Sequence, residues 1–282
     1  MSHVSPADSS DPMALAETAP ADAALIHPGW REDFLLAALL GLVAALATAA
    51  VFPYLLDTMP GLRDRIHLPM PVAMAAQAAQ ALIVVGALSL LGLRMTARSG
   101  LQLPWLRAVV GGKPRPHFPW VAAIASGLVV GALILFATLV VDPFMPALLG
   151  TANTSAATSA WHGFLASFYG GAVEEIELRL FAMTALVWLV ATVRRKTPGP
   201  ATYWFAILAA AVLFGVAHLP AAAQAWPLTT LVIARVVVLN AIGGIVFGWL
   251  YWKRGLEVAM VAHFGADLVL HVAAPLLSAA AP

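Results

Sequence analysis

Seven long apolar runs, separated by short polar stretches, dominate the pattern of this chain. Each run approaches or exceeds the roughly 20 residues that an α-helix needs to cross the hydrocarbon of a bilayer. None shows the alternation of apolar and polar residues that is typical of the strands of an outer-membrane barrel. We therefore predict an all-α fold, a polytopic transmembrane helical bundle with about seven spans. The predicted spans are approximately Phe34–Leu56, Pro69–Leu93, Trp120–Val141, Trp161–Val193, Tyr203–His218, Pro227–Trp252 and Leu256–Ser278.

The fourth run is too long for one straight crossing. Gly170 and Gly171 lie inside it, and paired small residues are common sites of helix kinks. We predict a bend at this pair, or a break between a partial helix and a full one.

The composition also indicates a membrane protein, because 61% of the residues are hydrophobic and only 10% are charged. Soluble domains carry about 25% charged residues. The net charge is close to zero and no run is rich in Lys or Arg, so no nucleic-acid partner is expected. The chain has no cysteine, which excludes disulfides, thiolate zinc sites and a cysteine nucleophile.

Residues 1–32 differ in composition from the rest, being rich in Ala, Pro, Ser and Asp. They lack a basic segment followed by an apolar one, so they do not form a signal peptide. We predict a disordered cytoplasmic tail here. The remainder is divided into N-terminal transmembrane helices at 33–142 and a C-terminal transmembrane core at 160–278.

The basic residues indicate the orientation of the spans. The tail and the even-numbered loops carry eleven Lys and Arg, whereas the opposite side carries only Arg63 and Arg65. Loops rich in Lys and Arg stay in the cytoplasm. We therefore expect a cytoplasmic N-terminus, an odd number of crossings and a multi-pass protein of the inner membrane of a bacterial cell, in contact with membrane lipid.

Several charged or polar side chains lie inside the predicted spans, and four of them are in the segment GGAVEEIELRLF at 170–181. A charge at the centre of a bilayer costs about 2.5 to 3.5 kcal/mol, so such groups are expected to face a watered, protein-lined cavity and to serve a function. The members of this group are Glu174, Glu175, Glu177, Arg179, His218, Arg235, Asn240, His263 and Asp267.

Helical spacing separates the roles of two neighbouring glutamates. Glu175 and Arg179 are four residues apart and share a helix face, so they are expected to pair. Glu174 points about 100° away from Glu175 and stays free for chemistry. His263 and Asp267 are also four apart, so the carboxylate can orient the imidazole or share its ligand.

These groups suit the hydrolysis of a peptide bond. A buried glutamate is a good general base for water. Two histidines can stabilise a developing oxyanion or can bind a metal that activates the water. The chain has no G-x-S-x-G segment and no H-E-x-x-H segment, so neither a serine triad nor a zincin-like zinc site is indicated.

Three short motifs in this order resemble the CPBP family of intramembrane endopeptidases, also called the CAAX-prenyl protease type II or Abi family. They are E-E-x-x-x-R at Glu174, Glu175 and Arg179, then F-x-x-x-H at Phe214 and His218, then H-x-x-x-D at His263 and Asp267. The resemblance covers roughly residues 160 to 275. The family usually has Gly after the motif arginine, where this chain has Leu180, and its third motif often ends in Asn, where this chain has Asp267.

The resemblance implies a role for each matching residue. Glu174 and His218 would activate the attacking water, His263 and Asp267 would stabilise the oxyanion, and Glu175 and Arg179 would support these groups. The substrate would be a membrane-associated peptide or protein, prenylated or bacteriocin-like. The family has been regarded both as metal-dependent and as a glutamate-type protease without metal. No cofactor is certain, and a divalent metal such as zinc would have Glu174, His218 and His263 as candidate ligands.

Other interpretations of the same residues stay open. Glu175 and Arg179 can form a purely structural ion pair, and His263 with Asp267 can be a helix-locking hydrogen bond. Intramembrane carboxylates and histidines are also found in ion-coupled transporters. A third alternative is a non-enzymatic immunity or scaffold protein on the same fold.

The catalytic interpretation also requires that the three motifs lie at the same depth in the bilayer. Counting from the predicted span ends at 1.5 Å per residue, His218 lies near the outer face, Glu174 near the middle and His263 in the cytoplasmic third. Tilted helices, a broken fourth span or shifted boundaries are needed to bring them together.

Overall fold

The structure is a computed structural model that describes residues 29–59, 61–147, 149 and 154–280 of the 282-residue chain. Almost all of the described residues are helical, and none of them forms a strand. The α-helices are α1 (Trp30–Thr58), α2 (Leu62–Arg65), α3 (Met70–Ser99), α4 (Pro104–Val110), α5 (Trp120–Val141), α6 (Ala156–Phe168), α7 (Thr184–Arg194), α8 (Pro200–Ala217), α9 (Leu219–Ala225), α10 (Thr230–Arg254), α11 (Leu256–Asp267) and α12 (Ala274–Ala280). A 3-10 helix, η1 (Asp142–Phe144), and three π-helical segments, η2 (Tyr169–Glu174), η3 (Ile176–Met183) and η4 (Leu268–Ala273), complete the order.

The predicted number of spans is confirmed: within the described residues, seven helical runs are long and apolar enough to cross a membrane. The predicted tail lies outside the described residues except for its last four, and Trp30, Arg31 and Glu32 already belong to α1. The division of the chain at 33–142 and 160–278 stays a prediction.

The fourth span does not break at its glycine pair. Residues Ala156–Arg194 form one continuous run of 39 residues through α6, η2, η3 and α7. The extra residues are accommodated by π-helical turns, which hold more residues per turn than an α-helix. Such turns are rare and often occur at functional sites.

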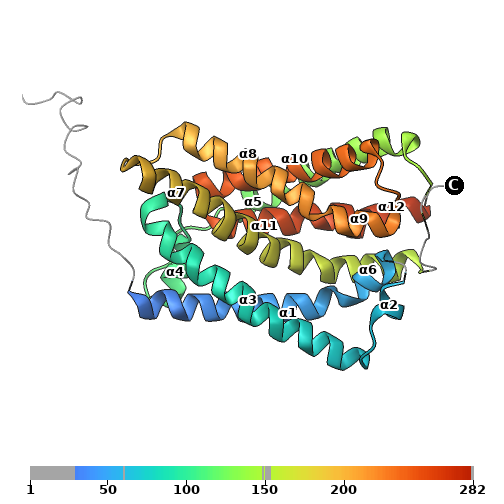
Figure 1. Cartoon of the computed structure of the whole chain (residues 1–282), viewed down its shortest axis with the longest axis horizontal. Helices are drawn as coiled ribbons and strands as arrows, with labels where there is room; N and C mark the ends of the chain where they lie inside the picture. The colour runs from blue at the N-terminus through green and yellow to red at the C-terminus, as the bar shows by residue number, and fades with distance from the viewer. Residues whose placement is uncertain (1–28, 60, 148, 150–153, 281–282) are drawn as a thin grey trace, which may run out of the picture.

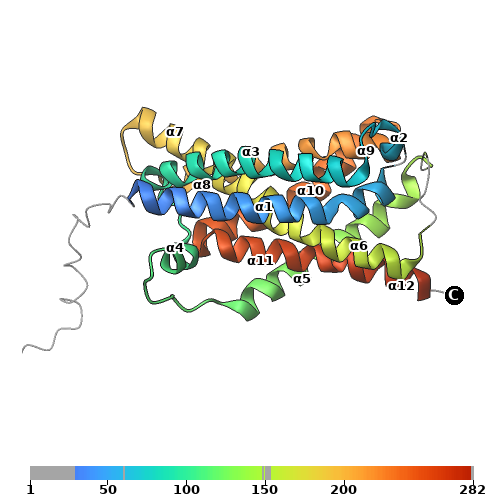
Figure 2. The same ribbon diagram turned by 90° about the horizontal axis from the view of Figure 1, so that it is seen from below.

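The helices run lengthwise through one elongated bundle (Figure 1). α1 packs along α3 and against α6, while α8 packs on α10 and α11 packs on α5. Figure 2 shows α1 and α6 between α3 on one side and α11 with α5 on the other. The start of α1 and the end of α12 lie at opposite ends of the bundle, as an odd number of crossings requires.

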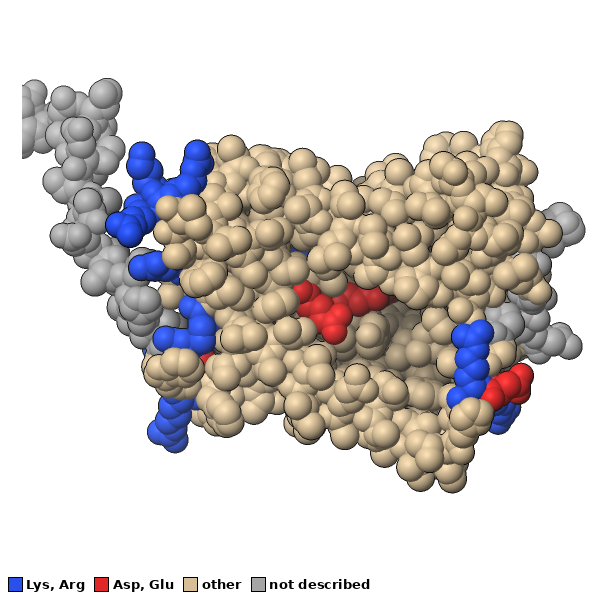
Figure 3. Space-filling model, in the orientation of Figure 1, with Lys and Arg blue, Asp and Glu red and all other residues tan. Residues whose placement is uncertain are grey.

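Lys and Arg gather mainly at the end where α1 begins and where α3, α7 and α10 finish, which we call the basic end (Figure 3). An ion-pair network ties helices together there. The carboxylate of Asp33 is fully buried and accepts hydrogen bonds from Arg94 at 2.7 Å and from Arg107 at 2.8 Å. Because both arginines pair with this one carboxylate, α1 is fixed to α3 and α4.

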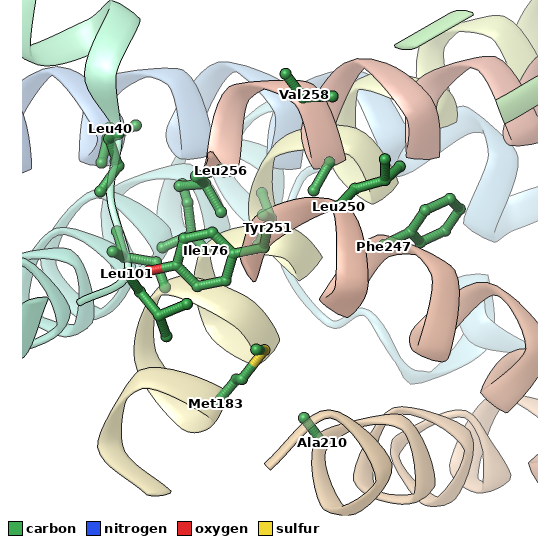
Figure 4. Close-up of a cluster of buried hydrophobic side chains, with 14 of the residues drawn as sticks. Leu40, Leu101, Ile176, Met183, Ala210, Phe247, Leu250, Tyr251, Leu256 and Val258 are labelled. Atoms are coloured by element: carbon green, nitrogen blue, oxygen red, sulfur yellow. The ribbon is translucent and has the colours of Figure 1, made fainter. Parts of the chain in front are cut away.

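The apolar core draws on many parts of the chain. Figure 4 shows side chains from α1 (Leu40), from the segment after α3 (Leu101), from η3, α8, α10 and α11 that meet in one cluster. Tyr251, which is 1% exposed, lies within this cluster. Core contacts of this kind hold the fourth, sixth and seventh spans at fixed positions, and these spans carry most of the charged groups.

Candidate active site

The charged positions lie beside the π-helical segments. Glu174 ends η2, Glu175 stands between η2 and η3, and Asp267 ends α11 directly before η4. The helices that carry the first and third motifs therefore both contain π-helical turns next to their candidate site residues.

Gly170 and Gly171 allow η2 to lie directly on α11. A Cβ at Gly170 would collide with the Asp267 carboxylate and would lie 3.2 Å from Nε2 of His263. A Cβ at Gly171 would lie 2.9 Å from the carbonyl oxygen of Met260. The glycine pair thus lets the fourth span pack closely against the seventh, and this packing brings Glu174 near the seventh span.

The carboxylate of Glu174 faces two imidazoles. Its Oε1 lies 3.7 Å from Nε2 of His218, and its Oε2 lies 3.6 Å from Nε2 of His263. Residues from the fourth, fifth and seventh spans therefore meet at one point. The expected mismatch in depth is resolved because the fifth span continues through α9 to Ala225, which places His218 well inside the span.

Each imidazole is oriented by a partner at Nδ1. Nδ1 of His218 lies 2.9 Å from the carbonyl oxygen of Phe214, and Nδ1 of His263 lies 2.8 Å from Oε1 of Glu175. Both partners can only accept, so the Nδ1 atoms donate. In each ring Nε2 is the atom that is directed at Glu174.

Glu175 and Arg179 form the expected pair, with Oε1 3.3 Å from Nη1. They are 0% and 1% exposed. The guanidinium also lies over the ring of Phe214 at 5.0 Å, and the His263 ring stacks on Phe247 at 4.6 Å. Because the same carboxylate binds Arg179 and His263, the pair holds the catalytic candidate His263 in place.

Asp267 lies next to two histidines. Its Oδ1 is 3.7 Å from Nε2 of His263, as the spacing predicts, and 3.8 Å from Nε2 of His271. Nδ1 of His271 forms a hydrogen bond of 3.0 Å with the hydroxyl of Tyr54 in α1. Tyr54 and His271 therefore extend the cluster.

Neither Tyr54 nor His271 is among the candidate residues that the sequence indicates. The spacing of four residues between Asp267 and His271 was a signal that could have included the histidine. No pattern in the first span points to Tyr54, since its partner is 217 positions away.

Leu180, which stands where the family usually has glycine, is fully buried. A Cβ on Gly92 of α3 would meet the backbone of Leu180 and would lie 2.8 Å from its Cγ. The small residue at this crossing is therefore supplied by α3 instead of η3, and the helices still pack closely.

The cluster has an accessible side and a buried side. The side chains of His218, His271 and Glu174 are 33%, 32% and 20% exposed, whereas His263 is 6% exposed. In Figure 3, acidic side chains lie in a hollow near the middle of the molecule, far from the basic end. Glu174 and His218 are thus accessible from outside the bundle, while Glu175 and Arg179 are buried.

The donor types of Glu174, His218 and His263 are those that divalent zinc prefers. However, among the residues that the structure describes, no group of three or more histidine or acidic side chains is arranged to hold a metal ion. The chemistry proposed below is therefore assigned to the side chains alone.

A family model described as Type II CAAX prenyl endopeptidase Rce1-like matches residues 155–269. No curated protein matches the chain, and no solved structure does. The matched range contains all seven residues of the three motifs. It contains neither Tyr54 nor His271.

Proposed function

We propose that this multi-pass membrane protein hydrolyses a peptide bond of a membrane-associated peptide or protein, and the match of residues 155–269 to the model of Rce1-like type II CAAX prenyl endopeptidases supports the proposal. The observation that carries the proposal is the position of the Glu174 carboxylate, within 3.7 Å of Nε2 in both His218 and His263. A carboxylate and two imidazoles that converge inside a bundle form an acid–base site where the hydrocarbon would otherwise exclude water.

The separation between Glu174 and His218 suits a bridging water. At 3.7 Å the two atoms are too far apart for a direct hydrogen bond, and a water can accept or donate to both. Glu174 then removes a proton from this water as the general base, while Nε2 of His218 accepts the second hydrogen bond and fixes the direction of attack.

His263 is suited to the developing oxyanion. Three carboxylates lie around its ring, those of Glu175, Glu174 and Asp267. With a proton on each nitrogen, the ring donates from Nδ1 to Glu175 and from Nε2 to the oxyanion of the tetrahedral intermediate. Asp267 supports this charge, and Glu175 with Arg179 keeps the ring oriented.

The steps balance without another reactant. The water oxygen bonds to the carbonyl carbon as its proton passes to Glu174. The carbon–nitrogen bond then breaks, and the same proton passes from Glu174 to the leaving amine. The products are a carboxylic acid and an amine, and the side chains return to their starting state.

The test is cleavage of membrane-anchored peptides, prenylated and unprenylated, by the purified protein in proteoliposomes. Loss of general-base catalysis typically lowers the rate about 10²- to 10⁴-fold, and we expect this for Glu174→Gln. Glu177→Gln is the matched control, since it removes the same charge from the same span outside the imidazole cluster. Equal cleavage by wild type and Glu174→Gln would refute the proposal.

The same variants separate the alternative functions. Solute flux across the vesicles that depends on pH, without any peptide cleavage, would favour an ion-coupled transporter. Full cellular function after Glu174→Gln would favour a non-enzymatic scaffold or immunity protein.

We further propose that the basic end faces the cytoplasm, because eleven Lys and Arg lie on that side and two on the other. The chain has no cysteine, so single cysteines can be labelled without background. In intact cells an impermeant thiol reagent should label Arg63→Cys and spare Lys196→Cys. The reverse pattern would overturn this orientation.

A further inference from the structure

A pocket of about 480 Å³ lies at the basic end, far from the catalytic cluster. It is formed where α3 and α10 end and where α4, α5 and α11 begin. Its size is within the range of ligand sites in proteins, about 300 to 1,000 Å³. The lining residues are Gly100, Gln102, Pro104, His117, Pro119, Tyr251, Trp252, Lys253, Arg254 and Gly255.

The lining is cationic and contains no carboxylate. Lys253 and Arg254 are exposed, and within the described part of the chain neither forms an ion pair with an acidic side chain. Nζ of Lys253 instead lies 3.5 Å from the centre of the Trp252 ring. The positive charge of the pocket is therefore available to a ligand.

The acidic residues of the same end are already engaged elsewhere. Glu32 and Asp33 pair with arginines of α3 and α4. Glu257, the acidic residue nearest in sequence to the pocket, is 6% exposed, and its Oε1 accepts a hydrogen bond of 2.8 Å from the backbone N–H of Leu106. Among the described residues of this end, the carboxylates of Glu32, Asp33 and Glu257 therefore already have protein partners, although Oε2 of Glu257 lies behind Gly255 in the pocket wall.

The walls of the pocket are held in place by backbone contacts. Gly255 alone links α10 to α11, with φ of 101°, a conformation that glycine adopts without strain. A Cβ there would lie 2.8 Å from Cδ of Pro104. The backbone N–H of Leu256 donates to the carbonyl oxygen of Gln102 at 3.2 Å. The ring of Trp252 stacks on Tyr203 at 4.7 Å, so the aromatic wall is fixed as well.

We propose that this pocket binds the phosphate headgroup of an anionic phospholipid of the surrounding leaflet. Arginine and lysine are the residues that recognise phosphate, and basic pockets between helices on the cytoplasmic side of a membrane bind such headgroups. Trp252 suits the level of the headgroups, where tryptophan is enriched. The apolar outer faces of α5 and α10 beside the pocket are available to the acyl chains.

Native mass spectrometry of the purified protein in neutral detergent tests the proposal, with titration of phosphatidylglycerol and of phosphatidylcholine that carries the same acyl chains. Each Lys or Arg near an anionic surface contributes about fivefold in affinity, so K253Q/R254Q should weaken phosphatidylglycerol binding roughly thirtyfold. The matched control is R194Q/R195Q, which removes two charges from the same end outside the pocket and should change binding less than threefold. Gln102→Glu, which places a carboxylate in the lining, should also weaken it.

Three outcomes would overturn the inference. One is equal binding of phosphatidylglycerol by wild type and K253Q/R254Q in samples with the same melting temperature. A second is an equal loss in R194Q/R195Q, which would indicate a general effect of charge. The third is displacement of the lipid by inorganic phosphate or glycerol phosphate at a similar concentration, which would assign the pocket to a soluble anion.

Discussion

A methyl group added at Gly170 should disable the site while leaving the bundle folded. The Cβ of Gly170→Ala would collide with the Asp267 carboxylate and would lie 3.2 Å from Nε2 of His263, the atom that faces Glu174. To regain ordinary van der Waals contact, these side chains must move on the order of 1 Å. A misplacement of that size can lower a catalytic rate about 100-fold, and we expect a loss of this order in peptide cleavage.

The effect on stability should be small, because the atoms that must move are at the ends of side chains. Forcing one side chain off its rotamer costs about 0.5 to 1.5 kcal/mol. At roughly 2–4 °C per kcal/mol, the melting temperature in detergent should fall by only a few degrees.

Two other glycines provide the controls. A Cβ at Gly163 would meet the backbone carbonyl of His271, which cannot rotate away, so Gly163→Ala should cost about 1 to 3 kcal/mol. A Cβ at Gly86 would find its nearest atoms at 3.7 Å, so Gly86→Ala should be neutral or stabilising by up to about 1 kcal/mol. Cleavage by Gly170→Ala within twofold of wild type would refute the reasoning.

Three further substitutions test other contacts. Arg179→Met should destabilise the protein by about 3 to 5 kcal/mol, because it leaves the buried Glu175 carboxylate without its cation; a drop in melting temperature of less than 3 °C would contradict this. Tyr54→Phe removes one hydrogen bond to His271, worth about 0.5 to 1.5 kcal/mol, and should lower the cleavage rate severalfold with substrate binding unchanged, as measured by kcat and KM. Asp33→Asn should destabilise the protein by a similar amount to Arg179→Met, because Arg94 and Arg107 lose the carboxylate that they share. A melting temperature equal to that of wild type would contradict the importance of this ion-pair network.

The sequence predicted the number of spans well, because long apolar runs have a single explanation when so few charges are present. It also predicted the pair Glu175–Arg179, since a spacing of four residues is a local property of a helix. Gly170 was different: the sequence predicted a bend or a break there, the helical run continues through the residue, and its closest contacts are with a neighbouring helix. That depends on what packs against the glycine, which no local pattern contains.

That Glu174, His218 and His263 share a cavity could be expected from their charges inside the spans and from the family resemblance, but their separations could not. Their separations depend on where the fifth span ends, and the continuation through α9 beyond Pro220 was not expected because proline so often ends a helix. The contact of Gly92 with Leu180 and that of Tyr54 with His271 join residues far apart in the chain. Only a tertiary structure reveals such contacts.

The support that α1 and α3 give to the later helices has a practical consequence. α1 contacts α6 and η2 and supplies Tyr54, while α3 packs on η3 and α7. The range that the family model matches begins only at 155. An excised fragment of that range would expose apolar helix faces that α1 and α3 normally cover, and it would lack Tyr54 and His271 of the polar cluster. Chimeras that exchange the matched range between related proteins will therefore need to carry the corresponding first and second spans with it.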